Sequence, residues 1–276
     1  MNSSVELPVP NEEGPHGELP HGEVRHGEVS SGEALRSKVQ DRRTTRTRMQ
    51  PLVAWRALRR LIAEPEQTHE VFTVIAALSG PALENGFRRF RTTAAGRKVL
   101  MDRLDLVDTL NDRDYLATLP TQSLGHFYRG FMTRENITAD GLVEASSDSD
   151  EFMQDDEDFA RFASRQRDMH DLWHALTQYG RDELGEVCLL AFTYAQTKNR
   201  GIGAICLAGC MKLYEFYGTD VFRAAWRAYR HGKQAAWLPA QDWEHLLTLP
   251  VAQVRADLQI STPVIYKHLR AQPALA

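Results

Sequence analysis

The feature that most constrains the fold is segment 159–196, in which two helical repeats of apolar residues are separated by a break at Tyr179-Gly180. At about 100° per residue, His170, Asp171 and His174 occupy one narrow arc of the first helix. The apolar residues of the same helix fall on the other side: Met169, Leu172, Trp173 and Leu176. This helix is therefore predicted to turn one face to a core and to present two imidazoles and a carboxylate on another.

The second helix is predicted to begin at Asp182, which is a good N-cap residue. Two antiparallel helices joined by a short turn would bring Glu186 back toward the two histidines. Gly185, which has no side chain, would allow a close approach of the two helices around this site.

Two histidines at i and i+4 are the usual helical arrangement for chelating a transition metal. With Asp171 and Glu186 they make four candidate ligands, consistent with zinc or with iron(II). An isolated His-x-x-x-His pair is more often not a metal site, and the two carboxylates favour the metal here. A zinc peptidase is not indicated, because its general-base glutamate is replaced by the shorter Asp171.

The rest of the chain also has helical periodicity, and no run of alternating strands is visible, so we expect an all-α fold with one helical domain over residues 49–262. Residues 1–48 contain repeated His-Gly-Glu triplets and are expected to be a disordered head, and residues 263–276 a C-terminal tail. Further helices are expected over 51–63, 66–79, 83–100, 112–118 and 124–132, with an exposed acidic loop over 144–158 that ends in an N-cap.

The first of these helices, Pro51–Ala63, is basic and amphipathic, with Leu52, Trp55, Leu58 and Ile62 at helical spacing. Such a helix can lie on an anionic bilayer, or its apolar stripe can pack on the core, and the sequence does not decide between these alternatives.

Composition excludes some classes of protein. A net charge of -4 gives no general attraction to nucleic acid, and no apolar run reaches the roughly 20 residues of a membrane span. The acid-rich head resembles neither a signal nor a transit peptide, which favours a bacterial cytoplasmic location. The three cysteines are expected to be inert thiols, and Gly201-Ile202-Gly203 lacks the third glycine of a dinucleotide-binding loop.

Two further sets of residues have two interpretations each. Arg165 and Arg167 would either pair with a substrate carboxylate or form salt bridges to Asp168 or to the acidic loop. The apolar runs 187–195 and 202–211 would either form plain core or line a groove for a lipid tail.

The run His170-Asp171-Leu172-Trp173-His174, followed after eleven residues by Glu186, resembles the signature of the coenzyme Q (ubiquinone) biosynthesis protein 4 family. Segments 184–197, 123–132 and 243–258 are similar to other parts of that family, and the resemblance covers roughly residues 51–260.

The resemblance implies an α-helical, dimeric protein at the membrane where ubiquinone is made, peripherally bound (here to the inner face of the bacterial membrane) among other enzymes of that pathway. It implies a divalent metal, usually described as zinc, on the residues that match the motif, which are also the candidate catalytic residues: His170, Asp171, His174 and Glu186.

The resemblance implies two alternative functions. The first is a lyase of the 4-hydroxy-3-methoxy-5-polyprenylbenzoate decarboxylase type, which replaces the carboxylate at ring carbon 1 of a polyprenylated hydroxybenzoate with a hydroxyl. The second is a non-catalytic lipid-binding scaffold that organises the ubiquinone biosynthetic complex and presents prenylated intermediates. Full closure of the metal by four protein ligands would count against redox chemistry.

Overall fold

The computed structural model describes residues 49–64, 68–137 and 156–271. Within these ranges the backbone is helical and forms no strand, apart from one isolated antiparallel bridge between Ser123 and Pro250. The all-α prediction is confirmed. The predicted head and most of the predicted acidic loop lie outside the described residues.

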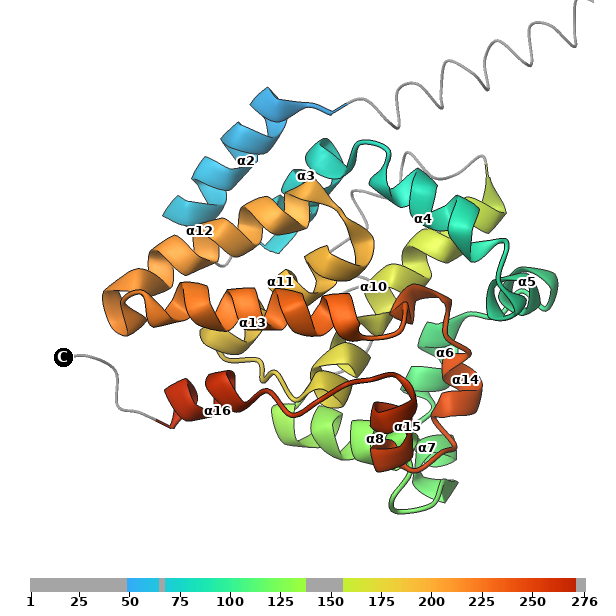
Figure 1. The fold of residues 1–276 in the computed structure, drawn as a ribbon. Helices are drawn as coiled ribbons and strands as arrows, with labels where there is room; N and C mark the ends of the chain where they lie inside the picture. Colours follow the sequence, from blue (N-terminus) through green and yellow to red (C-terminus); the bar gives the residue numbers. More distant parts are fainter. Residues whose placement is uncertain (1–48, 65–67, 138–155, 272–276) are drawn as a thin grey trace, which may run out of the picture. The chain divides into compact units, whose positions relative to one another are not determined.

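Figure 1 shows the helices of the described residues in chain order, coloured from blue to red. Their bounds are α2 Pro51–Ala63, α3 Thr68–Ser79, α4 Ala82–Phe90, α5 Ala94–Met101, α6 Leu106–Asn111, α7 Arg113–Thr118, α8 Leu124–Glu135, α10 Glu157–Thr177, α11 Glu183–Thr197, α12 Arg200–Tyr217, α13 Asp220–Gln234, η2 Leu238–Ala240, α14 Trp243–Leu246, α15 Val251–Asp257 and α16 Val264–Arg270.

The main core lies among α8, α10, α11 and α13, with smaller contributions from α12 and the C-terminal helices. α11 packs most extensively against α13, and Gln196 at its end joins three elements. The Gln196 amide donates to Gly232 O (2.6 Å) and accepts from Leu238 N–H (2.8 Å). A buried amide with both ends satisfied fixes the helices at this contact in one register.

The predicted helix over 83–100 is two helices, α4 and α5. The first helix ends at Phe90, and Thr93 begins the second: its backbone is extended, and its hydroxyl accepts from Gly96 N–H at 3.0 Å as the N-cap. Phe87 and Phe90 of α4 pack with Phe162 of α10 in a separate aromatic cluster. This contact braces the first half of α10.

The C-terminal half of α10 is held by α15. Arg255 donates from Nε to Leu176 O (2.8 Å) and from a terminal nitrogen to Ala175 O (3.0 Å), which are carbonyls of the last helical turn without partners inside the helix. Its guanidinium also lies over the ring of Phe127 in α8. Arg255 therefore ties α15 to both α8 and α10.

The helix α2 forms with the predicted bounds, but it buries Ala54 and Ala57 and leaves Leu52 and Trp55 70% and 56% exposed. Leu58 is half-buried against α3 and α12. Packing against the core therefore does not explain the presence of apolar side chains at Leu52 and Trp55. Within the described part of the chain, none of the helices combines the length and apolar character that a membrane crossing requires.

Candidate metal centre

The helix α10 presents the two histidines as its spacing predicts. It begins at Asp156, whose carboxylate accepts from Phe159 N–H at 3.1 Å, so the predicted N-cap at the end of the acidic segment is confirmed. Met169, Leu172 and Trp173 are buried in the main core. His170 and His174 therefore emerge together, one turn apart, and their rings meet edge-on with centroids 4.7 Å apart.

A short turn connects α10 to α11. Gln178 ends α10 in the left-handed conformation, and Asp182 begins α11 by accepting from Gly185 N–H at 3.0 Å, which confirms the predicted break and N-cap. A Cβ atom on Gly185 would lie 2.1 Å from Gly180 O. The close approach at Gly185 is thus between the first turn of α11 and the preceding turn, and it brings Glu186 into position.

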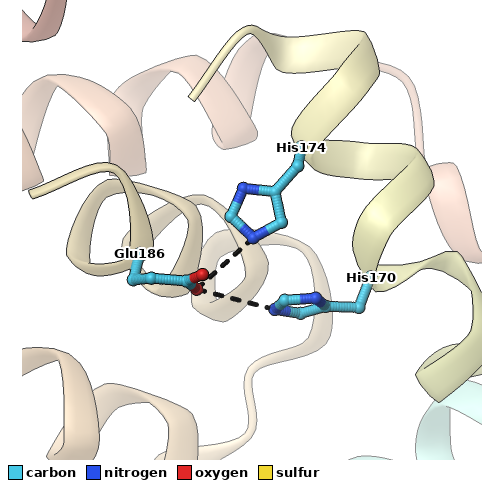
Figure 2. A group of neighbouring side chains, drawn as sticks. All are labelled: His170, His174 and Glu186. Carbon is cyan, nitrogen blue, oxygen red and sulfur yellow. Dashed lines mark ion pairs between the residues drawn. The ribbon is translucent and has the colours of Figure 1, made fainter. Parts of the chain in front are cut away.

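His170, His174 and Glu186 each contribute a ligand atom to a group in which these atoms all lie within 4.8 Å of one another. Figure 2 shows Glu186 pointing from α11 toward both rings of α10. Glu186 Oε2 lies 3.3 Å from His174 Nε2 and 3.8 Å from His170 Nε2. Two ligand atoms of a tetrahedral zinc are roughly 3.3 Å apart, given metal–ligand bonds of about 2.0–2.1 Å. The spacing suits a metal between these atoms.

Asp171 lies close to the group but faces the other side of the first ring. Its Oδ1 is 3.2 Å from His170 Nδ1, and its side chain is only 8% exposed. The structure therefore brings three of the four predicted ligands together at one point, and places the fourth, Asp171, against the Nδ1 nitrogen of a ligand.

His174 is oriented in the same way by the backbone. Its Nδ1 is 2.9 Å from Tyr179 O, and a carbonyl oxygen only accepts, so Nδ1 carries a proton, and in the neutral imidazole Nε2 has a free lone pair. The side chain of His174 is fully buried, and Nε2 makes no hydrogen bond although Glu186 lies nearby. A buried imidazole nitrogen with a free lone pair fits a metal ligand.

The electrostatics of the group follow from burial and opposite charges. Burial raises the carboxylate pKa of Glu186 and of Asp171, but the neighbouring histidines outweigh it, so the pKa of each carboxyl lies below its usual value. Burial lowers the pKa of His170, but the carboxylates of Asp171 and Glu186 outweigh it and raise that pKa. Without a metal, the histidines in their protonated form pair with these carboxylates.

The arginines that the sequence singled out are both engaged in ion pairs. Arg165 is buried and pairs bidentately with Glu244 at 2.7 Å, and Arg167 pairs with Asp168 at 3.1 Å. Of the two predicted alternatives, the structure therefore shows salt bridges. Sequence reasoning did not single out Arg181, an exposed cation in the turn between α10 and α11. Its charge contributes to lowering the pKa of Asp171 and of Glu186.

The fold and the site define a class: an all-helical protein in which two histidines of one helix and a glutamate of the next form a candidate metal centre. The family profile described as Coenzyme Q (ubiquinone) biosynthesis protein Coq4 matches residues 41–264. The chain belongs to this Coq4 family, as its signature residues predicted.

Curated relatives agree with this assignment. A mitochondrial ubiquinone biosynthesis protein of Podospora anserina is 31% identical over 181 residues, which are 65% of this chain and 58% of that protein. A homologue from Culex quinquefasciatus is 29% identical over 198 residues, 71% of this chain and 70% of its own length. The chain thus spans less than two thirds of the Podospora protein.

A solved structure supports the fold. The crystal structure of a candidate ubiquinone biosynthesis protein from Nostoc punctiforme superposes with a TM-score of 0.57 at 21% sequence identity, covering 78% of this chain and all of the other. At this identity the similarity shows a shared fold.

Proposed function

We propose that this protein acts in ubiquinone biosynthesis as a metal-dependent enzyme that replaces the carboxylate of a polyprenylated hydroxybenzoate with a hydroxyl at ring carbon 1. One observation supports this most directly: three candidate ligand atoms of His170, His174 and Glu186 converge, and the buried Nε2 of His174 has a free lone pair when the ring is neutral. The family indicates the biosynthetic pathway, and the three converging side chains could hold the metal that the proposed reaction needs.

The donor set fits either metal that the sequence predicted. Three protein ligands with an open position are typical of catalytic zinc, and two histidines with one carboxylate are typical of iron(II) oxygenases. We propose that Asp171 orients His170 rather than completing a closed four-ligand shell, since it faces Nδ1. When bound, the metal supplies a Lewis acid for the ring carboxylate or an adjacent phenolate.

The chain itself has to hold an anionic substrate and keep the ligands deprotonated. We propose that Arg181, exposed in the turn between α10 and α11, pairs with the substrate carboxylate, because Arg165 and Arg167 are engaged by Glu244 and Asp168. Exchange of a carboxylate for a hydroxyl is a two-electron oxidation. In this proposal the carboxyl group leaves as carbon dioxide, water supplies the hydroxyl oxygen, and dioxygen accepts the two electrons and becomes hydrogen peroxide.

The second candidate, a scaffold that presents prenylated intermediates, is favoured by the surface of α12. Of the two apolar runs, 187–195 is largely buried in the core, whereas Leu207 and Met211 of the other run are 57% and 63% exposed. Tyr214, one turn further on, is 50% exposed. Under this alternative the metal would be structural.

The membrane surface, the oligomeric state and the protein partners are also proposed. We propose peripheral binding to the inner face of a bacterial membrane, a homodimer, and association with other ubiquinone biosynthesis enzymes. The exposed Leu52 and Trp55 of α2, on a helix with several arginines, support binding to an anionic lipid surface.

The deciding experiment expresses wild type and the double variant His170→Ala, His174→Ala in cells blocked at ring decarboxylation. Quinone and its precursors are assayed, and metal content and thermal stability are recorded for both purified proteins. The matched control is His245→Ala, an exposed histidine of α14 outside the site.

We expect wild type and the control to restore quinone, and a folded, metal-free double variant to accumulate the prenylated benzoate. If the double variant still supports quinone synthesis, the enzyme proposal is wrong. If it fails to fold, the metal is structural and the scaffold takes its place.

A further inference from the structure

The helix α16 contacts the turn that joins the two helices of the candidate metal centre. Tyr266, a residue of α16 that is 3% exposed, accepts from Gly180 N–H at 2.8 Å and donates to Asp182 Oδ2 at 2.6 Å. Its ring also meets that of Tyr179 edge-on, with centroids 5.5 Å apart. One side chain thus contacts three of the five residues between α10 and α11.

Two neighbours of Tyr266 extend this contact. Lys267 Nζ donates to Gln178 Oε1 at 2.5 Å, and Arg270 Nε lies 3.2 Å from Asp182 Oδ2. Both are exposed, so their pairs are weak in water, and the buried hydroxyl of Tyr266 is the specific element of the contact.

On the side of α11, the hydroxyl holds the residue that begins the helix. Asp182 accepts from Gly185 N–H with Oδ1 and from Tyr266 with Oδ2, so both carboxylate oxygens are bound. Its carbonyl accepts from Glu186 N–H at 2.9 Å, in the first turn of α11. The position of Glu186 therefore depends on how Asp182 is held.

On the side of α10, the same hydroxyl holds Gly180, which directly follows Tyr179. The carbonyl of Tyr179 accepts from His174 Nδ1, and this bond orients the ring toward Glu186. A Cβ atom on Gly180 would lie 2.6 Å from the Tyr266 oxygen, so the hydroxyl sits directly against the backbone.

We infer that Tyr266 is a positioning residue for the metal centre: its hydroxyl fixes the turn so that Glu186 of α11 meets His174 of α10. The family match ends at residue 264, so this support comes from the part of the chain that follows it. The inference rests on the proposed metal centre, and the experiment separates the two.

The test titrates the full-length, metal-free protein with Co²⁺, followed by its visible absorption, in wild type and Tyr266→Phe. The variant keeps the ring and removes the hydroxyl. We expect roughly tenfold weaker Co²⁺ binding and a changed absorption band, as for other groups that orient metal ligands. Hydrogen exchange of the peptide over 178–186 should become faster in the variant.

Three controls accompany the test. Tyr115→Phe removes the hydroxyl of an exposed tyrosine in α7 and should bind Co²⁺ as wild type does. Asn199→Ala removes the cap of α12 and a 2.7 Å bond to Ser79 at the far end of α11, and it is expected to lower stability without touching the turn. His174→Ala reports whether Co²⁺ binds at the proposed centre.

Wild-type affinity and spectrum in Tyr266→Phe would overturn the positioning role alone. Equal losses of affinity in Tyr266→Phe and Asn199→Ala would also overturn it, because the effect would then be one of general stability. If His174→Ala binds Co²⁺ as tightly as wild type, the metal centre itself is wrong, and the positioning role is lost with it.

Discussion

At the scale of single residues, the site is decided by what lies on the Nδ1 side of each imidazole. Asp171 faces Nδ1 of His170, and the carbonyl of Tyr179 accepts from Nδ1 of His174, so both Nε2 atoms are left for Glu186 and a metal. The helical wheel places Asp171 on the ligand arc, but it does not say which nitrogen the carboxylate will meet.

The substitution Asp171→Asn separates an orienting carboxylate from a ligand. We expect zinc affinity to fall about 10- to 100-fold, because the charged partner of His170 is lost while three ligands remain. Zinc titration of the purified proteins measures this, with Asp168→Asn as the control, since Asp168 is equally buried but pairs with Arg167. Complete loss of binding, as in His170→Ala, would instead make Asp171 a ligand.

His231 should make folding sensitive to acid. It is buried, its Nε2 accepts from Ser261 N–H at 2.9 Å, and its Nδ1 lies 3.3 Å from the hydroxyl of Tyr179. Burial lowers its pKa below the usual 6.5, so the unfolded chain takes up the proton first. The free energy of unfolding should therefore fall as the pH drops below about 6.5. The stabilisation from burying neutral His231 should be fully present above that pH.

The measurement compares thermal unfolding of wild type and His231→Gln between about pH 7.5 and 5.5, the range in which histidine titrates. The acid-side fall in Tm should be smaller in the variant, whose amide oxygen can accept from Ser261 without titrating. His170, with a raised pKa, contributes with the opposite sign in both proteins and cancels in the comparison. Identical slopes would show that His231 is not responsible.

At the scale of helices, the sequence predicts which segments are helical better than where they stop. The break at Thr93 depends on one hydroxyl accepting from Gly96 N–H, and the apolar spacing of 83–100 continues through it. The helix α2 forms as its apolar spacing predicts, but it packs on α3 and α12 with its alanines buried, so Leu52 and Trp55 stay exposed. Periodicity identifies a face, and the neighbouring helices decide which part of it is covered.

The pairing of α2 with α3 should depend on Glu70. This residue is buried, with its side chain 4% exposed, and it pairs with Arg60, which is half-exposed. The Arg60 hydrogen bonds outweigh burial and hold the pKa of Glu70 below its usual 4.5. The stabilisation by the Arg60–Glu70 ion pair is fully present above the usual carboxyl pKa. It is lost as the pH falls through the lowered pKa that Glu70 has in the folded protein.

In Glu70→Gln we expect faster hydrogen exchange at neutral pH in α2 and α3, with the rest of the protein unchanged. The effect is local because the pair joins only these two helices. Glu84→Gln in α4 is the control, as Glu84 is only half-buried. Unchanged exchange in α2 would mean that the buried alanines hold this helix without the ion pair.

At the scale of the whole molecule, the candidate metal site lies on two helices that both pack into the main core. α10 and α11 bury Met169, Leu172 and Trp173 on one helix and Leu189 and Phe192 on the other, all within the main core. The ion pairs of the metal-free site join the same two helices. The fold therefore has a source of stability apart from the metal.

Removal of metal should leave the protein folded but less stable. We expect circular dichroism to keep its helical signal after chelation, and zinc at about 100 times its Kd to add roughly 2.7 kcal/mol to the free energy of unfolding. His174→Ala should abolish this increase in thermal denaturation. Unfolding on chelation alone would instead identify a structural metal, as the scaffold alternative requires.

The sequence determined the helical fold, the break at Tyr179-Gly180, the N-caps at the end of the acidic segment and at Asp182, and the family, because these depend on spacing and on residues close together in the chain. Only the tertiary structure decided that Asp171 faces Nδ1, that Arg165 pairs with Glu244, and that Tyr266 holds the turn. The partners of Arg165 and Tyr266 lie 79 and 86 residues away along the chain, and helical periodicity contains no information on such distances. The choice between two nitrogens of one ring depends on side-chain rotation, which spacing also leaves open.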